Sequence, residues 1–255
     1  MCYRLWKGEN RDIEFVDIVN PHHEVPAMRH EINGDTFYLS ETHAIMQYLC
    51  ELCGPETTQQ YFGRDIVERS VITHLLSWLH LGLRKRVMLE HLLPAFIRPY
   101  YLGTAVLKRP DENSISKWRS GCMEPLLHLN NKLTGGKRFL VGGRLTAADI
   151  ALAPAIAQIL VDPEYRSILG NFPNVARWLF YMSQRDAWKI AHYAVADAAE
   201  VIREHYKSKR SLPGSFDWVD KWETRFAVQI VREPRLPAHC ANEIMTFLER
   251  SHSPS

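Results

Sequence analysis

The hydrophobic pattern of this chain changes once, from the alternation of strands to the spacing of helices. In the first part, apolar runs flank Asn33-Gly34, the pair that most strongly indicates a two-residue hairpin, because both residues tolerate positive φ. We expect antiparallel strands near 27–32 and 36–39, preceded by a strand over 13–19, where β-branched residues are frequent. From about residue 64 onward the strand signals almost vanish. The pattern predicts an α+β chain that is mostly α, with a small α/β unit followed by an all-helical unit.

Helical spacing first appears between residues 44 and 52, where Ser40 or Thr42 can cap the start and Gly54-Pro55 provides a stop. Further helices are expected over 64–94, 114–133, 146–160, 173–189 and 194–206. The first of these has one apolar side, made of Ile66, Val71, Leu75, Leu76, Leu79 and Leu83. Pro125 is expected to kink or divide the second. Residues 207–215 are polar and are predicted to be a linker to a tail that can fold back as one or two helices.

Composition excludes several classes of protein. The chain has 255 residues, of which 46% are hydrophobic and 24% charged, so we do not expect it to be disordered. Its 31 Lys+Arg and 29 Asp+Glu give a net charge of +2, which offers no electrostatic footprint for nucleic acid. No apolar run approaches the ~20 residues of a membrane span. Five cysteines are few and odd in number for this length, which favours a reduced, cytoplasmic protein.

The strongest local motif is Leu145-Thr146-Ala147-Ala148-Asp149-Ile150. Thr146 can cap a helix and Asp149 can bond back to the Thr146 amide, which makes a capping box with Asp in place of Glu or Gln. Leu145 and Ile150 occupy the positions of a hydrophobic staple. We interpret the motif as structural.

Two other motifs each have a structural and a functional interpretation. Val25-Pro26 suits the start of an edge strand, or a cis bond that turns the Val25 backbone toward an extended peptide ligand. Ser40-Glu41-Thr42 suits simple capping, or a site in which helix amides bind a carboxylate while Glu41 binds an ammonium. The residues alone favour the structural interpretation of both.

Three further groups of residues are weaker candidates. Cys50 and Cys53 form a C-x-x-C pair, but at a helix C-terminus, where the dipole disfavours a thiolate, so a structural role is favoured. His22-His23 and His30 have no diagnostic metal-ligand spacing. Arg84-Lys85-Arg86 is more typical of a solvated helix face than of an anion site.

Four segments, taken in order, resemble the cytosolic glutathione transferase family, over roughly residues 1–206. They are Asn20-Pro21-x-x-x-Val25-Pro26-Ala27-Met28, Phe37-Tyr38-Leu39-Ser40-Glu41-Thr42-x-Ala44-Ile45-x-x-Tyr48-Leu49, Leu145-Thr146-x-Ala148-Asp149-Ile150, and Phe172-Pro173-Asn174-x-x-x-Trp178. The long helix that carries Trp78 and Arg84 looks most like theta-type members.

The resemblance implies a thioredoxin-like domain at 1–56, truncated here, an all-helical domain at 62–206 and a C-terminal extension at 207–255. It implies a homodimer that conjugates glutathione, as substrate rather than cofactor, to an apolar electrophile. Val25, with Pro26 cis, would pair with the cysteinyl backbone, and Glu41 and Thr42 would hold the γ-glutamyl end. Trp78 and Arg84 are candidates for a second-substrate or anion site. No metal and no membrane are implied.

The chain departs from the family pattern at its start. The first strand, the residue that activates the thiol and the usual second helix are missing from the sequence, so the catalytic residue is unknown, with only Cys2 or Tyr3 to nominate. A sheet without its first strand has unpaired edges. Either the fold is remodelled or the sequence is a truncated gene model. The alternative function is therefore a non-catalytic scaffold or dimerisation module, which the Trp-rich tail also suggests.

Overall fold

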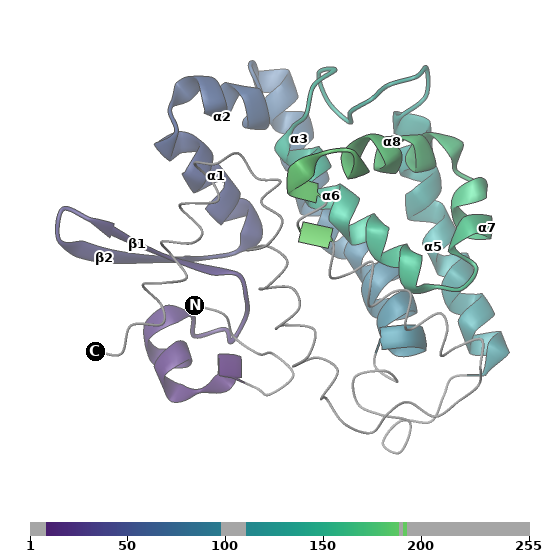
Figure 1. The fold of residues 1–255 in the computed structure, drawn as a ribbon, viewed down its shortest axis with the longest axis horizontal. Coiled ribbons are helices and arrows are strands. Elements are labelled where there is room, and N and C mark those ends of the chain that lie inside the picture. The colour runs from purple at the N-terminus through teal and green to yellow at the C-terminus, as the bar shows by residue number, and fades with distance from the viewer. Residues whose placement is uncertain (1–8, 98–110, 189–190, 193–255) are drawn as a thin grey trace. The chain divides into compact units, whose positions relative to one another are not determined.

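A computed structural model describes residues 9–97, 111–188 and 191–192 (Figure 1). Within them the chain is mostly helical, with one two-stranded sheet. A small N-terminal sheet followed by helices agrees with the predicted fold class. The described residues form two compact units, one from 9–78 and 139–152 and the other from 79–97, 111–138 and 153 onward.

The hairpin forms as predicted. Strand β1 (Ala27–Ile32) pairs antiparallel with β2 (Asp35–Ser40), from Ala27 opposite Ser40 to Ile32 opposite Asp35. Asn33 and Gly34 form the turn with φ of 53° and 90°, the positive values that this pair supplies in a type I′ turn. Helix α1 (Thr42–Leu52) follows at once, also as predicted.

The predicted strand over 13–19 is wrong. Residues 13–14 are helical and continue into η3 (Phe15–Val19), which has π-helical winding, after the short 3₁₀ turn η2 (Glu9–Arg11). The amide of Asn20 donates to the Phe15 carbonyl at 2.9 Å. A strand must find a partner for its backbone, whereas a helical turn satisfies its own donors locally. Only Phe15 of this apolar run is buried, so packing does not demand strand alternation.

Helix α2 (Pro55–Phe62) was not predicted, because Gly54-Pro55 was interpreted only as a stop. Proline is equally favoured at the first position of a helix, where its missing N–H costs nothing. Gly54, at φ 100°, makes the turn between the two helices.

The predicted helix over 64–94 exists in two parts, α3 (Ile66–Trp78) and η4 (Leu79–Ile97), the second with π-helical winding. Its apolar side is only partly as predicted: Ile66 is 72% exposed, whereas Ile72 and Leu75 are buried. The buried stripe of α3 therefore begins at Ile72, later than the sequence pattern suggested.

The second unit is built around α5 (Glu112–Lys132), against which η4 and α8 (Pro173–Ser183) pack. Asp111 caps α5 through a 2.8 Å bond from the Ser114 amide to Oδ1. Of the two outcomes expected for Pro125, division of the helix does not occur. The proline ring is buried, and one lost hydrogen bond is offset by that packing.

The rest of the described chain is α6 (Ala147–Ala157), the 3₁₀ turn η5 (Gln158–Val161) and the short helix α7 (Tyr165–Gly170), which was not predicted. The core of the second unit is a set of fully buried side chains: Leu83, Val87, Leu92, Ile115, Leu126, Leu129, Val175 and Trp178. The predicted helix at 194–206, the tail at 207–255, Cys2 and Tyr3 lie outside the described residues.

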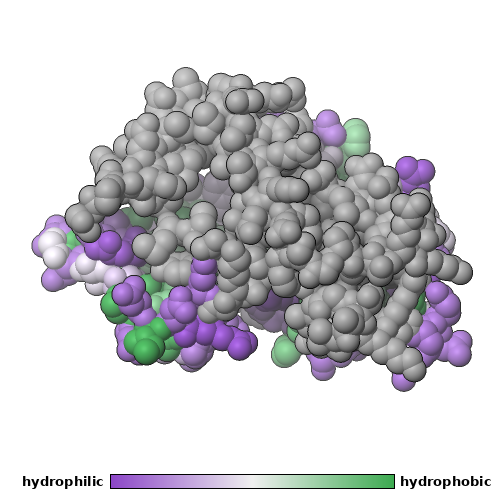
Figure 2. Space-filling model, turned by 60° about the horizontal axis from the view of Figure 1, so that its bottom comes forward, coloured by the Kyte–Doolittle hydropathy of each residue, from purple (hydrophilic) through white to green (hydrophobic). Residues whose placement is uncertain are grey.

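No helix among the described residues is both long and apolar enough to cross a bilayer. The described surface mixes hydrophilic and apolar areas, with green apolar atoms between purple ones on the face drawn in Figure 2. Exposed apolar side chains on the first unit include Ile32, Phe37, Leu49, Leu52, Ile66 and Val67.

Candidate functional site

The register of the hairpin brings two of the predicted site segments to one end of the sheet. Because Ala27 pairs with Ser40, Val25-Pro26 enters β1 at the end where Glu41-Thr42 leaves β2. The Val25–Pro26 peptide bond is cis. Among the described residues, no hydrogen bond occupies the main chain of Val25, which is itself exposed.

Asn20 shapes the loop that leads into Val25. Its side chain is buried, donates from Nδ2 to the Glu24 carbonyl at 2.9 Å and accepts from the His22 amide at 3.0 Å. These bonds form the side-chain turn that asparagine favours, and they hold residues 20–24 in a fixed loop. The Asn-Pro motif of the sequence thus positions the segment that carries Val25.

Glu41 has a strained backbone. Its φ of 73° and ψ of 118° lie in a region that L-residues rarely adopt. It stands at the N-cap of α1, yet its side chain does not cap the helix and has no partner among the described residues. Such strain persists where surrounding structure maintains it and is often found at binding sites. The Glu41 side chain is exposed, so its carboxylate is accessible to a ligand.

Thr42 is the first residue of α1 and is also exposed. The first intrahelical hydrogen bond of α1 joins the Ile45 amide to the Glu41 carbonyl at 3.0 Å. The backbone amides before Ile45 therefore precede the hydrogen-bonded part of the helix. Amides at a helix start carry partial positive charge and favour a carboxylate. One end of the hairpin thus combines an open strand backbone, anion-binding amides and an exposed carboxylate.

Trp78 and Arg84 fall in different units. Trp78 ends α3 and is half-buried, and Arg84 is exposed within η4. Their joint site stays a prediction. In the neighbouring basic residues, Lys85 lies 3.8 Å from Glu90, and Arg86 pairs with Glu124 of α5, which fits a solvated face.

The C-x-x-C pair does not look redox-active. Cys50 and Cys53 end α1, and both are free thiols. Burial, then the neighbouring Cys53 and Glu51, raise the pKa of the Cys50 thiol. A reactive thiol needs the opposite shift. As for metals, the described residues contain no cluster of three or more His, Cys, Asp or Glu side chains that could hold an ion.

Half of the predicted capping box before α6 is observed, namely the bond from the Thr146 amide back to the Asp149 side chain. The Thr146 amide donates to Asp149 Oδ2 at 3.0 Å, and the Thr146 hydroxyl donates to the same oxygen at 2.9 Å. The second oxygen, Oδ1, accepts from the Leu140 amide at 2.9 Å, so one buried carboxylate holds both the helix and the preceding loop.

The same loop is fastened to α3. Arg144 makes a two-pronged bond to Glu68, with distances of 2.8 and 2.6 Å, and donates from Nε to the Gln60 carbonyl at 3.1 Å. These bonds from Arg144, followed by one from the Arg64 amide, lower the pKa of Glu68 to about 2. Gly142 suits this position because its φ of 62° is one that L side chains rarely adopt, and a Cβ would also displace the ends of the Glu68 and Arg144 side chains. The Arg144 guanidinium thus has a structural role.

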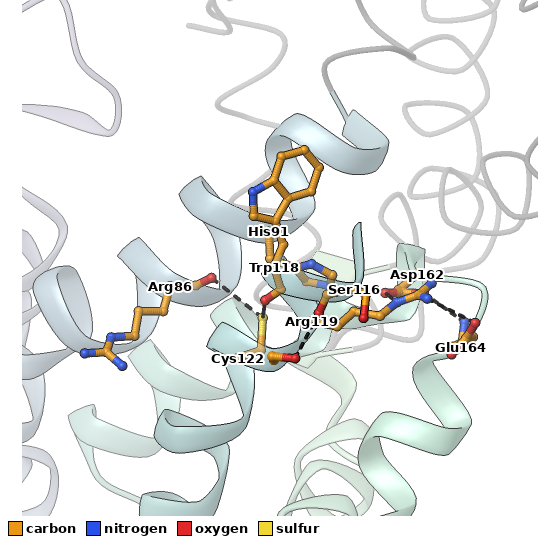
Figure 3. Close-up of polar contacts among 9 residues, drawn as sticks. Arg86, His91, Ser116, Trp118, Arg119, Cys122, Asp162 and Glu164 are labelled. Carbon is orange, nitrogen blue, oxygen red and sulfur yellow. Dashed lines mark hydrogen bonds and ion pairs between the residues drawn. The ribbon is translucent and has the colours of Figure 1, made fainter. Parts of the chain in front are cut away.

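Sequence reasoning missed a buried polar cluster in the second unit (Figure 3). Asp162 accepts two bonds from Arg119, at 2.9 and 2.7 Å, and lies 3.1 Å from Nε2 of His91. Arg119 also reaches Glu164 at 3.0 Å. Burial alone would raise the pKa of Asp162, but the bonds from His91, Arg119 and the Glu164 amide lower it overall.

Cys122 lies close to this cluster in Figure 3, with its sulfur 3.4 Å from the Trp118 carbonyl and 3.6 Å from that of Arg86. Burial, followed by the charges of Asp162 and Glu90, raises the pKa of its thiol to about 12. The cluster joins residues 43 and 71 positions apart, so no local sequence signal could have found it.

Comparison with known proteins shows similarity to glutathione S-transferases. Residues 112–179 match the model of the glutathione S-transferase C-terminal domain. A glutathione S-transferase domain-containing protein of Dictyostelium discoideum is 26% identical, over 76% of this chain and 69% of its own length. Glutathione S-transferase D7 of Drosophila melanogaster is 29% identical, over 68% of this chain and 67% of its own. Human glutathione S-transferase theta-2B is 26% identical, over 68% and 65%.

Solved structures show the same fold. A Bombyx mori glutathione transferase, BmGSTD1, superposes with a TM-score of 0.59 at 22% identity, covering 80% of this chain and 83% of that one. A Pseudomonas fluorescens family member with two glutathione molecules bound gives a TM-score of 0.58 at 22% identity, covering 72% and 77%. The chain is therefore similar to glutathione S-transferases, both in the domain match of residues 112–179 and in its fold. Theta-class proteins are among its relatives.

Proposed function

We propose that this protein binds glutathione at the end of the hairpin and conjugates it to electrophilic small molecules. The observation that carries the proposal is the meeting of Val25 and Glu41 at one end of the sheet. The unoccupied main chain of Val25 and the exposed start of α1 offer complementary partners for a short, zwitterionic peptide.

Each part of glutathione has a partner in this arrangement. The N–H and C=O of its cysteinyl residue pair with those of Val25, in the manner of an added strand. The γ-glutamyl carboxylate faces the first amides of α1 and the Thr42 hydroxyl, where the helix dipole favours negative charge. The ammonium group of the same end meets the Glu41 carboxylate. The register of the hairpin thus sets the spacing between the contact at Val25 and the contacts at Glu41 and Thr42.

The reaction joins the glutathione sulfur to a carbon of the electrophile. The thiol loses its proton, the thiolate attacks, and the leaving group departs with the displaced electron pair. Binding both substrates in one site supplies much of the acceleration. The residue that lowers the thiol pKa is not assigned. A homodimer, a cytoplasmic location and the use of glutathione without a further cofactor belong to the same proposal, as does a second-substrate site near Trp78 or Arg84.

The test is calorimetric titration of the full chain with glutathione and with S-hexylglutathione, followed by conjugation of a generic aryl halide. We expect binding by the wild type, and an affinity about tenfold lower for Glu41→Gln, because a charged partner of the ammonium is lost. Thr42→Ala should weaken binding less.

The matched control is Glu56→Gln, which neutralises another exposed carboxylate in the first turn of a helix and should leave binding unchanged. A folded full-length chain that neither binds glutathione nor conjugates it would contradict the proposal. If the chain binds glutathione but does not conjugate it, the proposed binding site stands and the proposed conjugation is wrong.

A further inference from the structure

A single residue joins the hairpin to helix α1. Strand β2 ends at Ser40 and α1 begins at Thr42, so the backbone of Glu41 sets the direction in which the helix leaves the sheet. One residue has only two soft dihedral angles, φ and ψ. Any contact that fixes the direction of α1 relative to the sheet therefore also fixes the backbone conformation of Glu41.

Three rings make such a contact. His30 of β1 and Phe37 of β2 are paired across the hairpin, so their side chains are neighbours on one face of the sheet. The Tyr48 hydroxyl of α1 lies 2.7 Å from Nδ1 of His30, and the two rings stand edge to face with centroids 5.8 Å apart. The centroid of the Phe37 ring lies 5.3 Å from that of Tyr48. These three residues, the ring cluster, hold α1 against both strands (Figure 1).

The ring cluster holds α1 at a distance from its connection to the sheet. Tyr48 lies six residues after Thr42, which is about 9 Å along the helix axis. The helix is thus fixed at two points, by the chain at Glu41 and by the rings at Tyr48, and two points define the direction of an axis. The Tyr48 hydroxyl donates to Nδ1 of His30 when that nitrogen has no proton and accepts when it carries one, so the contact persists in either state.

Glu41 has the strained conformation that this arrangement would impose. Its φ of 73° and ψ of 118° are rare for an L-residue, and its side chain makes no capping bond to the helix. Strain of this kind persists only where surrounding contacts outweigh its cost. The ring cluster supplies such contacts, because the hairpin register holds His30 and Phe37 in place.

We propose that the ring cluster forces Glu41 into its strained conformation and thereby directs the Glu41 carboxylate and the first amides of α1 toward the ligand. Tyr48 is then a positioning residue, which acts through the direction of α1 rather than by contact with the substrate. The statement about the ligand rests on the proposed glutathione site. The statement about the strain does not.

Urea unfolding of the full chain without glutathione tests the origin of the strain. In the wild-type background Glu41→Gly should unfold at a higher urea concentration than Glu41→Ala, because glycine adopts positive φ without strain. In a Tyr48→Leu background the helix can turn and residue 41 relaxes, so the two midpoints should coincide or exchange order. An unchanged difference in the Tyr48→Leu background, or no difference in the wild type, overturns the proposal.

Two further backgrounds serve as a second disruption of the cluster and as a control. Phe37→Ala removes one ring from a side chain that is 39% exposed, so the chain should fold while the difference at residue 41 narrows. Tyr38→Phe removes a tyrosine hydroxyl from the opposite face of β2 and should leave the difference unchanged. If Tyr38→Phe narrows the difference as much as Phe37→Ala does, the ring cluster has no specific role and the proposal is overturned.

Calorimetric titration with glutathione tests the positioning of the carboxylate. Tyr48→Leu should weaken binding about tenfold, and adding Glu41→Gln to it should weaken binding no further, because a misdirected carboxylate no longer contributes. His30→Asn offers the Tyr48 hydroxyl another polar partner and should retain the affinity that His30→Leu loses.

The two measurements separate a failure of this inference from a failure of the proposed function. If the wild type binds glutathione and the losses from Tyr48→Leu and Glu41→Gln are additive, the positioning role is wrong and the glutathione site stands. If the wild type does not bind glutathione, the proposed function is wrong, and the urea midpoints alone decide whether the ring cluster causes the strain at Glu41.

Discussion

At the scale of single residues, substitutions at Glu41 can distinguish the energetic cost of its strained backbone from the contribution of its carboxylate to glutathione binding. A non-glycine residue at φ 73° costs about 1–3 kcal/mol, and glycine would remove that cost while adding up to about 1 kcal/mol of entropy to the unfolded chain. We expect Glu41→Gly to be more stable than Glu41→Ala by about 1 kcal/mol, measured by urea unfolding. Both variants should lose the same affinity for glutathione, because both lose the carboxylate.

The control for this comparison is Glu56, which lies within a helix at an ordinary backbone conformation. There the order reverses, since glycine weakens a helix relative to alanine. If Glu41→Gly and Glu41→Ala unfold at the same urea concentration, the backbone conformation at residue 41 has no measurable cost to stability. The importance of this residue would then lie in its exposed carboxylate alone.

At the scale of elements, local signals predicted most of what was found. Asn33-Gly34 carries its own turn geometry, and Thr146 with Asp149 carries its own cap, so both were recognisable within a few residues. The predictions that failed concern segments whose structure is not decided by a few neighbouring residues. The apolar run at 13–19 has strand-like residues but no partner strand in the part of the chain that the structure describes, and Pro55 can end one helix or begin the next. Which outcome occurs depends on residues far away in the sequence.

The cap of α6 should be among the most sensitive sites in the chain. Asp149 is fully buried and accepts bonds from Thr146 and from the Leu140 amide. We expect Asp149→Ala to cost about 2–4 kcal/mol of unfolding free energy, because it removes a cap and leaves buried amides without acceptors. Chemical denaturation measures the loss.

Two variants control for other causes. Thr146→Ser keeps the hydroxyl that donates to Asp149 and should be much milder. Asp111→Ala removes the exposed cap of α5 and should also cost less than Asp149→Ala, since water replaces its bond to Ser114. Equal losses for Asp149→Ala and Asp111→Ala would show that burial does not set the value of a cap here.

At the scale of the whole molecule, the family resemblance supplied what local patterns could not. Val25 and Glu41 are each ordinary in isolation, and only the hairpin register shows that they share one end of the sheet. The resemblance said nothing of the buried cluster at Asp162. That cluster depends on side chains particular to this chain, which lie as far as 71 residues apart in the sequence. The second-substrate or anion site at Trp78 and Arg84 remains a prediction.

The Asp162 cluster holds three segments of the second unit together, since His91 lies in η4, Arg119 in α5 and Asp162 directly after η5. Removing one partner of a buried ion pair leaves an uncompensated charge, so Asp162→Ala should lower the unfolding free energy by about 3–5 kcal/mol. Glu164 pairs with the same Arg119 but is 60% exposed, and Glu164→Gln should cost less than about 1 kcal/mol. Denaturant unfolding at neutral pH distinguishes the two variants.

The same carboxylate gives a pH dependence with a definite sign. The pKa of Asp162 is lower in the folded chain than its ordinary 3.8, despite burial, because Arg119 and His91 bond to the charged form. Its contribution is therefore fully present above about pH 4 to 5 and is lost as pH falls through the folded pKa. Asp162→Asn does not titrate, so its stability should fall less steeply than that of the wild type between pH 5 and 3. Parallel curves for the two proteins over that interval would mean that the charge of Asp162 does not stabilise the second unit.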